Sequence, residues 1–242
     1  MLLFRQGDVV GSLREFDKAI ELDPRQKAYL WQRGLSLYYL DRFEEGAEQF
    51  RIDVAQNPND TEESIWCFLC EAQLYGVDEA RKRYLEVGKD PRPVMREVYN
   101  LFKDGGDPEK LVAGFLNGRD SEYFYASLYA GLYYEAENKP EGAKRCIISA
   151  CQSPYGERSD DYMASLAKLY WQMHPLREFR FQSKMFDKSL AKTRAIVLKK
   201  PHTYSVLVQA QKTRYILQID PDPAYAAGSG LPILGEERES LK

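Results

Sequence analysis

The chain has 242 residues, of which 44% are hydrophobic and 29% charged, so it can bury a core but has no uninterrupted apolar run near the roughly 20 residues that a membrane-crossing helix needs. Two histidines leave almost no material for a histidine-rich metal site or a histidine-based charge relay. The net charge of -3 gives no global reason to expect a nucleic acid as partner.

An internal repeat organises the first part of the chain. Matching positions stand 34 residues apart in four pairs: Asp8 and Arg42, Ser12 and Gly46, Phe16 and Phe50, Pro24 and Pro58. One more step of the same length leads to Ala80 and Tyr84. A later unit starts at Phe124, where Gly131, Ala143 and Ile147 have the spacing of Gly34, Gly46 and Phe50. A fixed period of this length is typical of helical repeat proteins.

Each repeat predicts two antiparallel helices. In the second repeat, residues 28–40 carry apolar side chains at helical spacing, and another amphipathic run extends from Phe43 to Val54. A small residue in the second helix allows close approach, and a large residue four positions later fills the gap: Ser12 and Phe16, Gly46 and Phe50, Ala80 and Tyr84, Ala143 and Ile147. Pro24 and Pro58 end these helices.

This pattern resembles the tetratricopeptide repeat over about residues 1–170. The segment from Ile20 to Pro24 is similar to the usual ending of a repeat in that family, whereas Phe68 stands where the family usually has glycine. Residues 93–117 predict a further helix pair around the turn from Asp104 to Pro108. The resemblance implies an all-α fold, with a solenoid of helical hairpins over residues 1–174 and an irregular C-terminal extension.

A capping helix is expected at the end of the solenoid, over residues 158–173. In the tetratricopeptide family, the first helix of each pair lines the concave face. The resemblance therefore implies a protein-binding groove formed by Trp31, Leu35, Tyr38, Tyr39, Ile65, Leu69, Gln73, Tyr125, Leu128 and Glu135. The alternative is that half of these residues pack between helices. The family's carboxylate-clamp positions are mainly aromatic or aliphatic here, so no such clamp is expected.

The charge is unevenly distributed. Residues 176–200 contain eight Lys or Arg against two acidic residues, a net charge of +6, whereas the residues before them carry -8. A basic helix is expected over residues 175–200, with a stripe formed by Arg180, Lys184, Lys188 and Lys192. This stripe is either a solvated face or a contact for an acidic partner, an anionic membrane surface or, as the weakest option, RNA phosphates.

The last part of the chain, residues 201–242, is expected to be an extended tail. Two runs rich in β-branched and aromatic residues could form a small β-hairpin over residues 203–219, although a helix across 203–217 is nearly as well supported. The segment after Asp220 is rich in Pro and Gly and is not expected to form a helix or a strand. Its apolar residues either dock on another protein or belong to a disordered terminus: Tyr225, Leu231, Ile233 and Leu234.

No catalytic or cofactor-binding motif is found in the sequence, and we expect no cofactor, no metal and no enzymatic activity. Cys67 and Cys70 stand in an apolar run without a turn residue and predict core cysteines one helical turn apart. The acidic pairs Glu62–Glu63 and Asp160–Asp161 stand at helix starts, where the helix dipole explains them.

The expected function is therefore a non-catalytic protein–protein interaction scaffold. It would be a peripheral or auxiliary subunit, or an assembly factor, of a larger complex. A photosynthetic complex is one candidate, because the segment from Asp60 to Trp66 is similar to repeat proteins of bacteria and phototrophs with assembly or adaptor roles. The alternatives are an RNA-associated helical repeat protein and an adaptor that regulates an enzyme. The expected protein is soluble and resides in a reducing compartment, either the chloroplast near the thylakoid or the cytoplasm.

Overall fold

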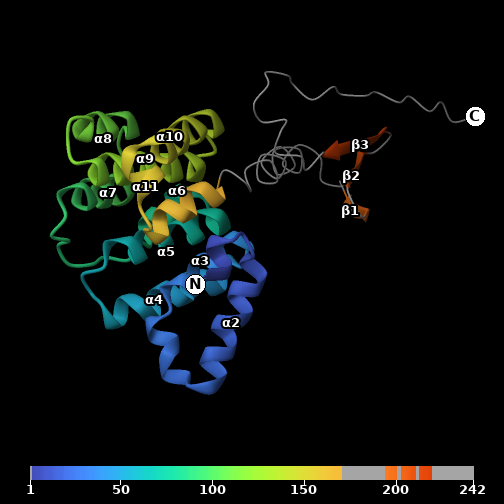
Figure 1. Cartoon of the computed structure of the whole chain (residues 1–242), viewed down its shortest axis with the longest axis horizontal. Helices are drawn as coiled ribbons and strands as arrows, with labels where there is room; N and C mark the ends of the chain where they lie inside the picture. Colours follow the sequence, from blue (N-terminus) through green and yellow to red (C-terminus); the bar gives the residue numbers. More distant parts are fainter. Residues whose placement is uncertain (1, 171–193, 201–202, 211–212, 220–242) are drawn as a thin grey trace, which may run out of the picture. The chain divides into compact units, whose positions relative to one another are not determined.

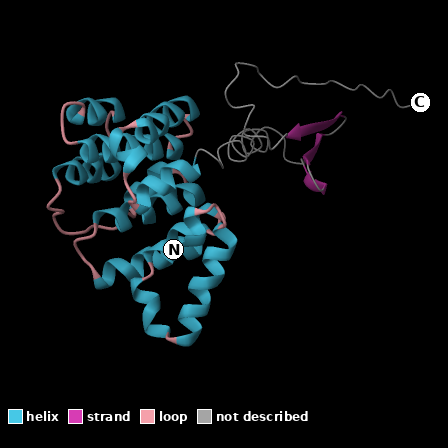
Figure 2. Cartoon of the chain, viewed as in Figure 1, coloured by secondary structure: helices cyan, strands magenta, loops and turns pink. Residues whose placement is uncertain are grey.

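The computed structural model describes residues 2–170, 194–200, 203–210 and 213–219. The chain divides into two units, Met1–Pro175 and Leu176–Lys242 (Figure 1). In the first unit, the described residues form helices and connecting loops without any strand (Figure 2). The prediction of an all-α fold is confirmed for this part of the chain.

The first unit consists of short helices joined by short loops. In chain order these elements are α1 (Leu2–Arg5), α2 (Val9–Leu22), a 3-10 helix (Pro24–Tyr29), α3 (Trp31–Tyr39), α4 (Phe43–Gln56), α5 (Thr61–Tyr75), α6 (Val77–Lys82), α7 (Pro93–Asp104), α8 (Pro108–Phe115), α9 (Asp120–Ala136), α10 (Pro140–Gln152), α11 (Pro154–Arg158) and a helix over residues 162–170.

Side-chain caps and prolines set the helix ends. Asp8 caps α2, because its Oδ1 accepts a 2.8 Å hydrogen bond from the backbone N–H of Gly11. Asp23 and Pro24 end α2 and turn the chain into the 3-10 helix. Asp60 caps α5 by accepting from the N–H groups of the first turn. The helix boundaries in the first two repeats therefore follow local sequence signals.

Helices α3 and α4 approach each other closely at Gly34. A Cβ atom placed on Gly34 would lie 2.6 Å from Cζ of Phe50, a distance that real Cβ atoms do not tolerate. The ring of Phe50 is fully buried and occupies the space that a side chain at position 34 would take. Phe50 therefore fills the gap between the helices, as the sequence predicts.

The same arrangement recurs between α9 and α10. A Cβ atom on Gly131 would lie 2.7 Å from Cγ1 of Ile147 and 3.2 Å from the carbonyl oxygen of Ala143. Each glycine and its large partner are 16 residues apart in the sequence, in this pair and in α3–α4. Two helix pairs that are far apart in the chain are therefore packed in the same way, with a large side chain against a glycine.

The pair formed by α5 and α6 departs from this packing. Phe68 replaces the glycine, and its ring packs at 5.8 Å from the ring of Tyr84. Helix α6 has only 6 residues and ends at Lys82, before Tyr84, whereas α4 has 14. The ring of Phe68 stands where the other two pairs have no side chain, and after Arg83 the chain continues as the loop that leads to Pro93.

Helices α7 and α8 flank the turn from Asp104 to Pro108, where a helix pair was expected. Gly105 and Gly106 have φ angles of 82° and 155°, which other residues adopt only with strain. The capping helix starts later than predicted. Residues 154–158 form the separate helix α11, and the next helix starts after Asp161, whose Oδ1 accepts from the N–H of Met163 at 2.8 Å.

Helices α5 and α9 form the centre of the unit. Every residue from 63 to 72 and every residue from 126 to 136 is buried. Helix α9 packs against α7, α8, α10 and α11, and α5 packs against α3, α4, α6 and α7. A helix that is apolar and buried all round is a core element rather than a surface element.

The second unit is described only as a three-stranded antiparallel sheet in the order β1 (Arg194–Lys200), β2 (Thr203–Ala210) and β3 (Thr213–Ile219). Strands β2 and β3 pair from Tyr204 with Ile219 to Ala210 with Thr213, which is the hairpin expected over residues 203–219. Strand β1 occupies residues that were expected to end the basic helix. Its run of Ala, Ile, Val and Leu favours a strand, so the helix prediction is wrong for 194–200.

Candidate functional site

The structure places most of the predicted groove in the core. Seven of the ten residues are at most 3% exposed: Leu35, Tyr38, Tyr39, Ile65, Leu69, Leu128 and Glu135. Only Trp31, Gln73 and Tyr125 are partly exposed. The groove prediction therefore needs correction for the seven buried residues. They lie on α3, α5 and α9, whose inner positions are covered by neighbouring helices on more than one side.

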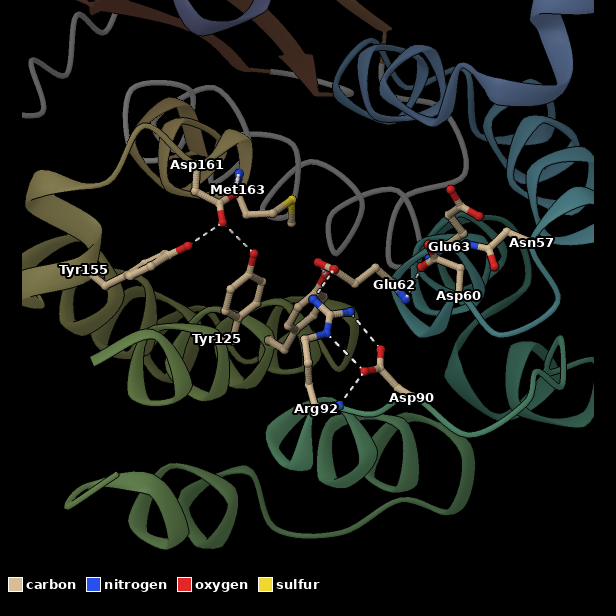
Figure 3. Close-up of polar contacts among 11 residues, drawn as sticks. Asn57, Asp60, Glu62, Glu63, Asp90, Arg92, Tyr125, Tyr155, Asp161 and Met163 are labelled. Carbon is tan, nitrogen blue, oxygen red and sulfur yellow. Dashed lines mark hydrogen bonds and ion pairs between the residues drawn. The ribbon is translucent and has the colours of Figure 1, made fainter. Parts of the chain in front are cut away.

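The main polar cluster of the unit lies where α5, α9 and two loops meet, and we call it the Glu62 network (Figure 3). It connects side chains that are distant in the sequence. Its members are Glu62, Asp90, Arg92, Tyr125, Tyr129, Tyr155 and Asp161.

Glu62 is bound from two sides. Arg92 Nη1 donates to Glu62 Oε2 at 2.8 Å, and the hydroxyl of Tyr129 donates to Glu62 Oε1 at 2.8 Å. Both oxygens of this carboxylate are thus satisfied, which a carboxylate with little access to water requires. Glu62 lies in α5, Arg92 directly precedes α7, and Tyr129 lies in α9. The two hydrogen bonds therefore join three elements.

Arg92 is itself held by Asp90. Its Nη2 and Nε donate to the two carboxylate oxygens of Asp90 at 2.7 and 3.1 Å, and its backbone N–H donates to Asp90 Oδ1 at 2.8 Å. Asp90 is only 4% exposed. A fork-shaped pair of this kind fixes the plane of the guanidinium group. The remaining Arg92 nitrogen is therefore directed at Glu62.

Asp161 anchors the other end of the network. The hydroxyls of Tyr125 and Tyr155 both donate to Asp161 Oδ2, at 2.8 and 2.7 Å. Stacked rings of Tyr125 and Tyr129, with centroids 6.3 Å apart, connect this end to the Glu62 end, and the guanidinium of Arg92 lies 5.8 Å from the Tyr125 ring centroid. The network therefore ties α9 to the start of the last described helix.

The electrostatics of the network keep its tyrosines protonated. Burial raises the pKa of Tyr125 and Tyr129 well above the ordinary value, and the neighbouring Glu62 carboxylate adds to the shift. Burial also raises the pKa of Glu62, against the opposing effect of Arg92. A protonated phenol can donate to a carboxylate but is a poor base or nucleophile. This arrangement is suited to holding elements in place.

The sequence showed part of this site. It placed Glu62, Glu63 and Asp161 at helix starts, where the structure has them. Arg92 and Tyr129 were not singled out, because no local pattern indicates that their partner Glu62 lies 30 or 67 residues earlier in the chain. Asp90 was not singled out either, although its partner Arg92 is only two residues away. Tyr125 was expected in a groove and is instead a hydrogen-bond donor to Asp161.

The cysteines behave as core residues. Cys67 and Cys70 lie one turn apart in α5 and are buried, as expected. Burial raises the pKa of Cys67 to about 12 and that of Cys146 to about 11, so these thiols stay protonated at neutral pH. Within the described residues, no group of three or more His, Cys, Asp or Glu could hold a metal ion.

Two predicted contact surfaces lie outside the described residues: the basic stripe of Arg180, Lys184, Lys188 and Lys192, and the tail residues Tyr225, Leu231, Ile233 and Leu234. None of the described helices combines the length and hydrophobicity that a membrane crossing requires. No protein-family model matches the chain.

Proposed function

We propose that this chain is a non-catalytic protein–protein interaction scaffold whose helical unit is a tetratricopeptide-type solenoid. The observation that carries the proposal is the repeated packing of a glycine against a large residue 16 positions later, at Gly34 with Phe50 and at Gly131 with Ile147. Repetition of one packing unit along a chain is the basis of solenoid proteins.

The contacts between helices support the same proposal. Neighbours in sequence pack together, as α3 with α4 and α9 with α10, and so do alternate helices: α3 with α5, α5 with α7, and α7 with α9. In a stack of helical hairpins, the first helices of successive hairpins contact one another in this way. The Glu62 network would then brace the stack, because it joins α5 directly to α9.

The proposed role is that of a peripheral or auxiliary subunit, or an assembly factor, of a larger complex. Solenoids present extended surfaces that bind proteins. The Glu62 network of protonated tyrosines and paired carboxylates gives such a body rigidity without supplying a nucleophile. Of the predicted groove, Trp31, Gln73 and Tyr125 retain some exposure for a partner.

The proposal is tested by purifying the tagged full chain from its own cells under native conditions, followed by mass spectrometry. We expect a defined protein to co-purify in constant ratio and to persist after ribonuclease treatment. Retention of RNA that falls steeply with salt, and is lost when Lys184, Lys188 and Lys192 are changed to Gln, would instead favour the RNA-associated alternative. A chain that purifies alone at every salt concentration would contradict the scaffold proposal.

A fold control separates specific binding from stickiness. Phe50→Ala should disrupt the α3–α4 pair and release a partner that recognises the folded surface. Binding that survives in this variant, despite a lost thermal transition, indicates capture of unfolded chain and counts against the proposal. If the partner is an enzyme whose activity changes on binding, the adaptor role is the one that applies.

A further inference from the structure

Two buried carboxyl groups at the junction of α4 and α5 are short of partners. Asp53 and Glu63 are 3% and 7% exposed, yet Asp53 Oδ2 and Glu63 Oε2 have no hydrogen-bond partner among the described residues. Figure 3 shows Glu63 beside Asp60 and Asn57 at the start of α5. An ionised carboxylate in such a place costs several kcal/mol unless it is paired.

The groups around this pair do not supply a cation. From α4, Gln49 Nε2 donates to Asp53 Oδ1 at 3.1 Å and to the carbonyl of Lys27 at 2.6 Å. From α3, Arg33 donates to Asp17 at 2.7 Å and to Gln49 Oε1 at 3.2 Å. Arg33 therefore acts on Asp53 only through space, without a hydrogen bond to it.

The remaining charged neighbours are acidic. Asp60 lies in the loop between the helices, and Glu62 lies next to Glu63 on α5, where it is already bound by Arg92 and Tyr129. Burial raises the pKa of Asp53 to about 7 and that of Glu63 to about 9, and Asp60 adds to both shifts. Near neutral pH the packed junction thus holds protons that an opened junction would release.

We propose that Asp53 and Glu63 form a proton-operated joint between α4 and α5, which is tight while both carboxyls carry protons and loosens as they lose them. The sign follows from linkage. The folded-state pKa of each group is raised, so its stabilising contribution is complete below the unfolded value near 4 and is lost as pH rises through the folded value. The pH range over which this stabilising contribution is lost therefore ends near pH 7 for Asp53 and near pH 9 for Glu63.

The test is hydrogen exchange of the full chain between pH 6 and 8.5, with each rate divided by the intrinsic rate at that pH. Opening that releases one proton should lower the protection of amides in residues 54–66 about tenfold per pH unit. Amides of α10 should show a weaker dependence. Exposed thiols have an ordinary pKa of about 8.5 and add a dependence of the same sign at the upper end of this range, so the slopes are compared between pH 6 and 8.

Matched variants decide the assignment. Glu63→Gln should remove most of the pH dependence above pH 7. Below pH 7 both carboxyls release protons on opening, so Asp53→Asn should reduce the dependence there to that of Glu63 alone and leave the dependence above pH 7 in place. Glu63→Leu serves if the amide variant folds poorly. Glu44→Gln, an exposed position in the first turn of α4, should keep the full dependence. Equal pH dependence in the parent chain and in Glu63→Gln, or protection that does not change with pH in the parent, would overturn the proposal.

Discussion

The hydroxyl of Tyr129 donates a 2.8 Å hydrogen bond to Glu62, a residue 67 positions earlier in the chain. This contact joins α9 to α5, the two helices at the centre of the unit. Tyr129→Phe keeps the ring and removes only the donor, so one carboxylate oxygen loses its partner. We expect the free energy of unfolding to fall by about 1–3 kcal/mol, measured by urea denaturation.

The control for this change is Tyr75→Phe. Tyr75 is 50% exposed, and its ring faces Arg83 at 4.6 Å, a contact that Phe preserves. The urea concentration at the midpoint of unfolding should be the same for Tyr75→Phe as for the parent chain. A loss at position 129 no larger than the loss at position 75 would show that the Glu62 network contributes little to stability.

The ion pair between Arg92 and Glu62 is the second contact to test. Arg92→Met keeps a long side chain but leaves Glu62 with Tyr129 alone. The change also takes the guanidinium group from Asp90, which is 4% exposed. Because the side chain of Arg92 is itself 40% exposed, we expect a loss of about 2–3 kcal/mol, below the cost of breaking a fully buried pair. Arg25→Met is the comparison, since Arg25 pairs with Asp23 at 89% exposure and should change little.

The Arg92 variant also predicts a pH dependence. Loss of the guanidinium group removes an effect that lowers the pKa of Glu62, so that pKa rises further above its ordinary value. A raised folded-state pKa means that stability falls as pH rises. The melting temperature of Arg92→Met should therefore move closer to that of the parent chain as pH is lowered from 7 toward 5. An unchanged difference between the two proteins would contradict this.

The contact between Gly34 and Phe50 can be tested as a coupled pair. Phe50→Ala should cost about 3–5 kcal/mol as a large-to-small change in the core. Gly34→Ala should cost about 1–3 kcal/mol, because its new methyl group overlaps the ring. With Phe50→Leu already in place, the cost of Gly34→Ala should shrink. Strict additivity would show that the two residues do not meet and that the assigned repeat register is wrong.

Thiol labelling tests the packing of α5 and α10. Cys67, Cys70 and Cys146 are buried, whereas Cys151 is partly exposed. Iodoacetamide at pH 8 should therefore modify Cys151 first, and the other three should react only after unfolding. Mass spectrometry of the digested protein reads this directly. Early modification of Cys67 or Cys70 would mean that α5 is not the central helix.

Particular residues show how far the sequence could lead. The spacing of Gly34, Gly46 and Phe50 predicted the α3–α4 pair because helix packing is periodic and local. The same reasoning misjudged Leu35, Tyr38 and Leu69, since amphipathic spacing shows which residues avoid water but not how many neighbours will cover a helix. Strand β1 was assigned to the basic helix because the four-residue spacing of the basic stripe predicted a helix that continues through Ile196 and Leu198.

The sequence by itself determined the local elements of this protein: the repeated helix pairs, the proline and aspartate boundaries, and the core character of Cys67 and Cys70. These follow from backbone geometry and the burial of apolar side chains, which act over a few residues. Only the tertiary structure decided which polar groups meet. Glu62 finds Arg92 and Tyr129, whereas Asp53 and Glu63 lack a cation, because partners of buried charges are set by the stacking of distant helices.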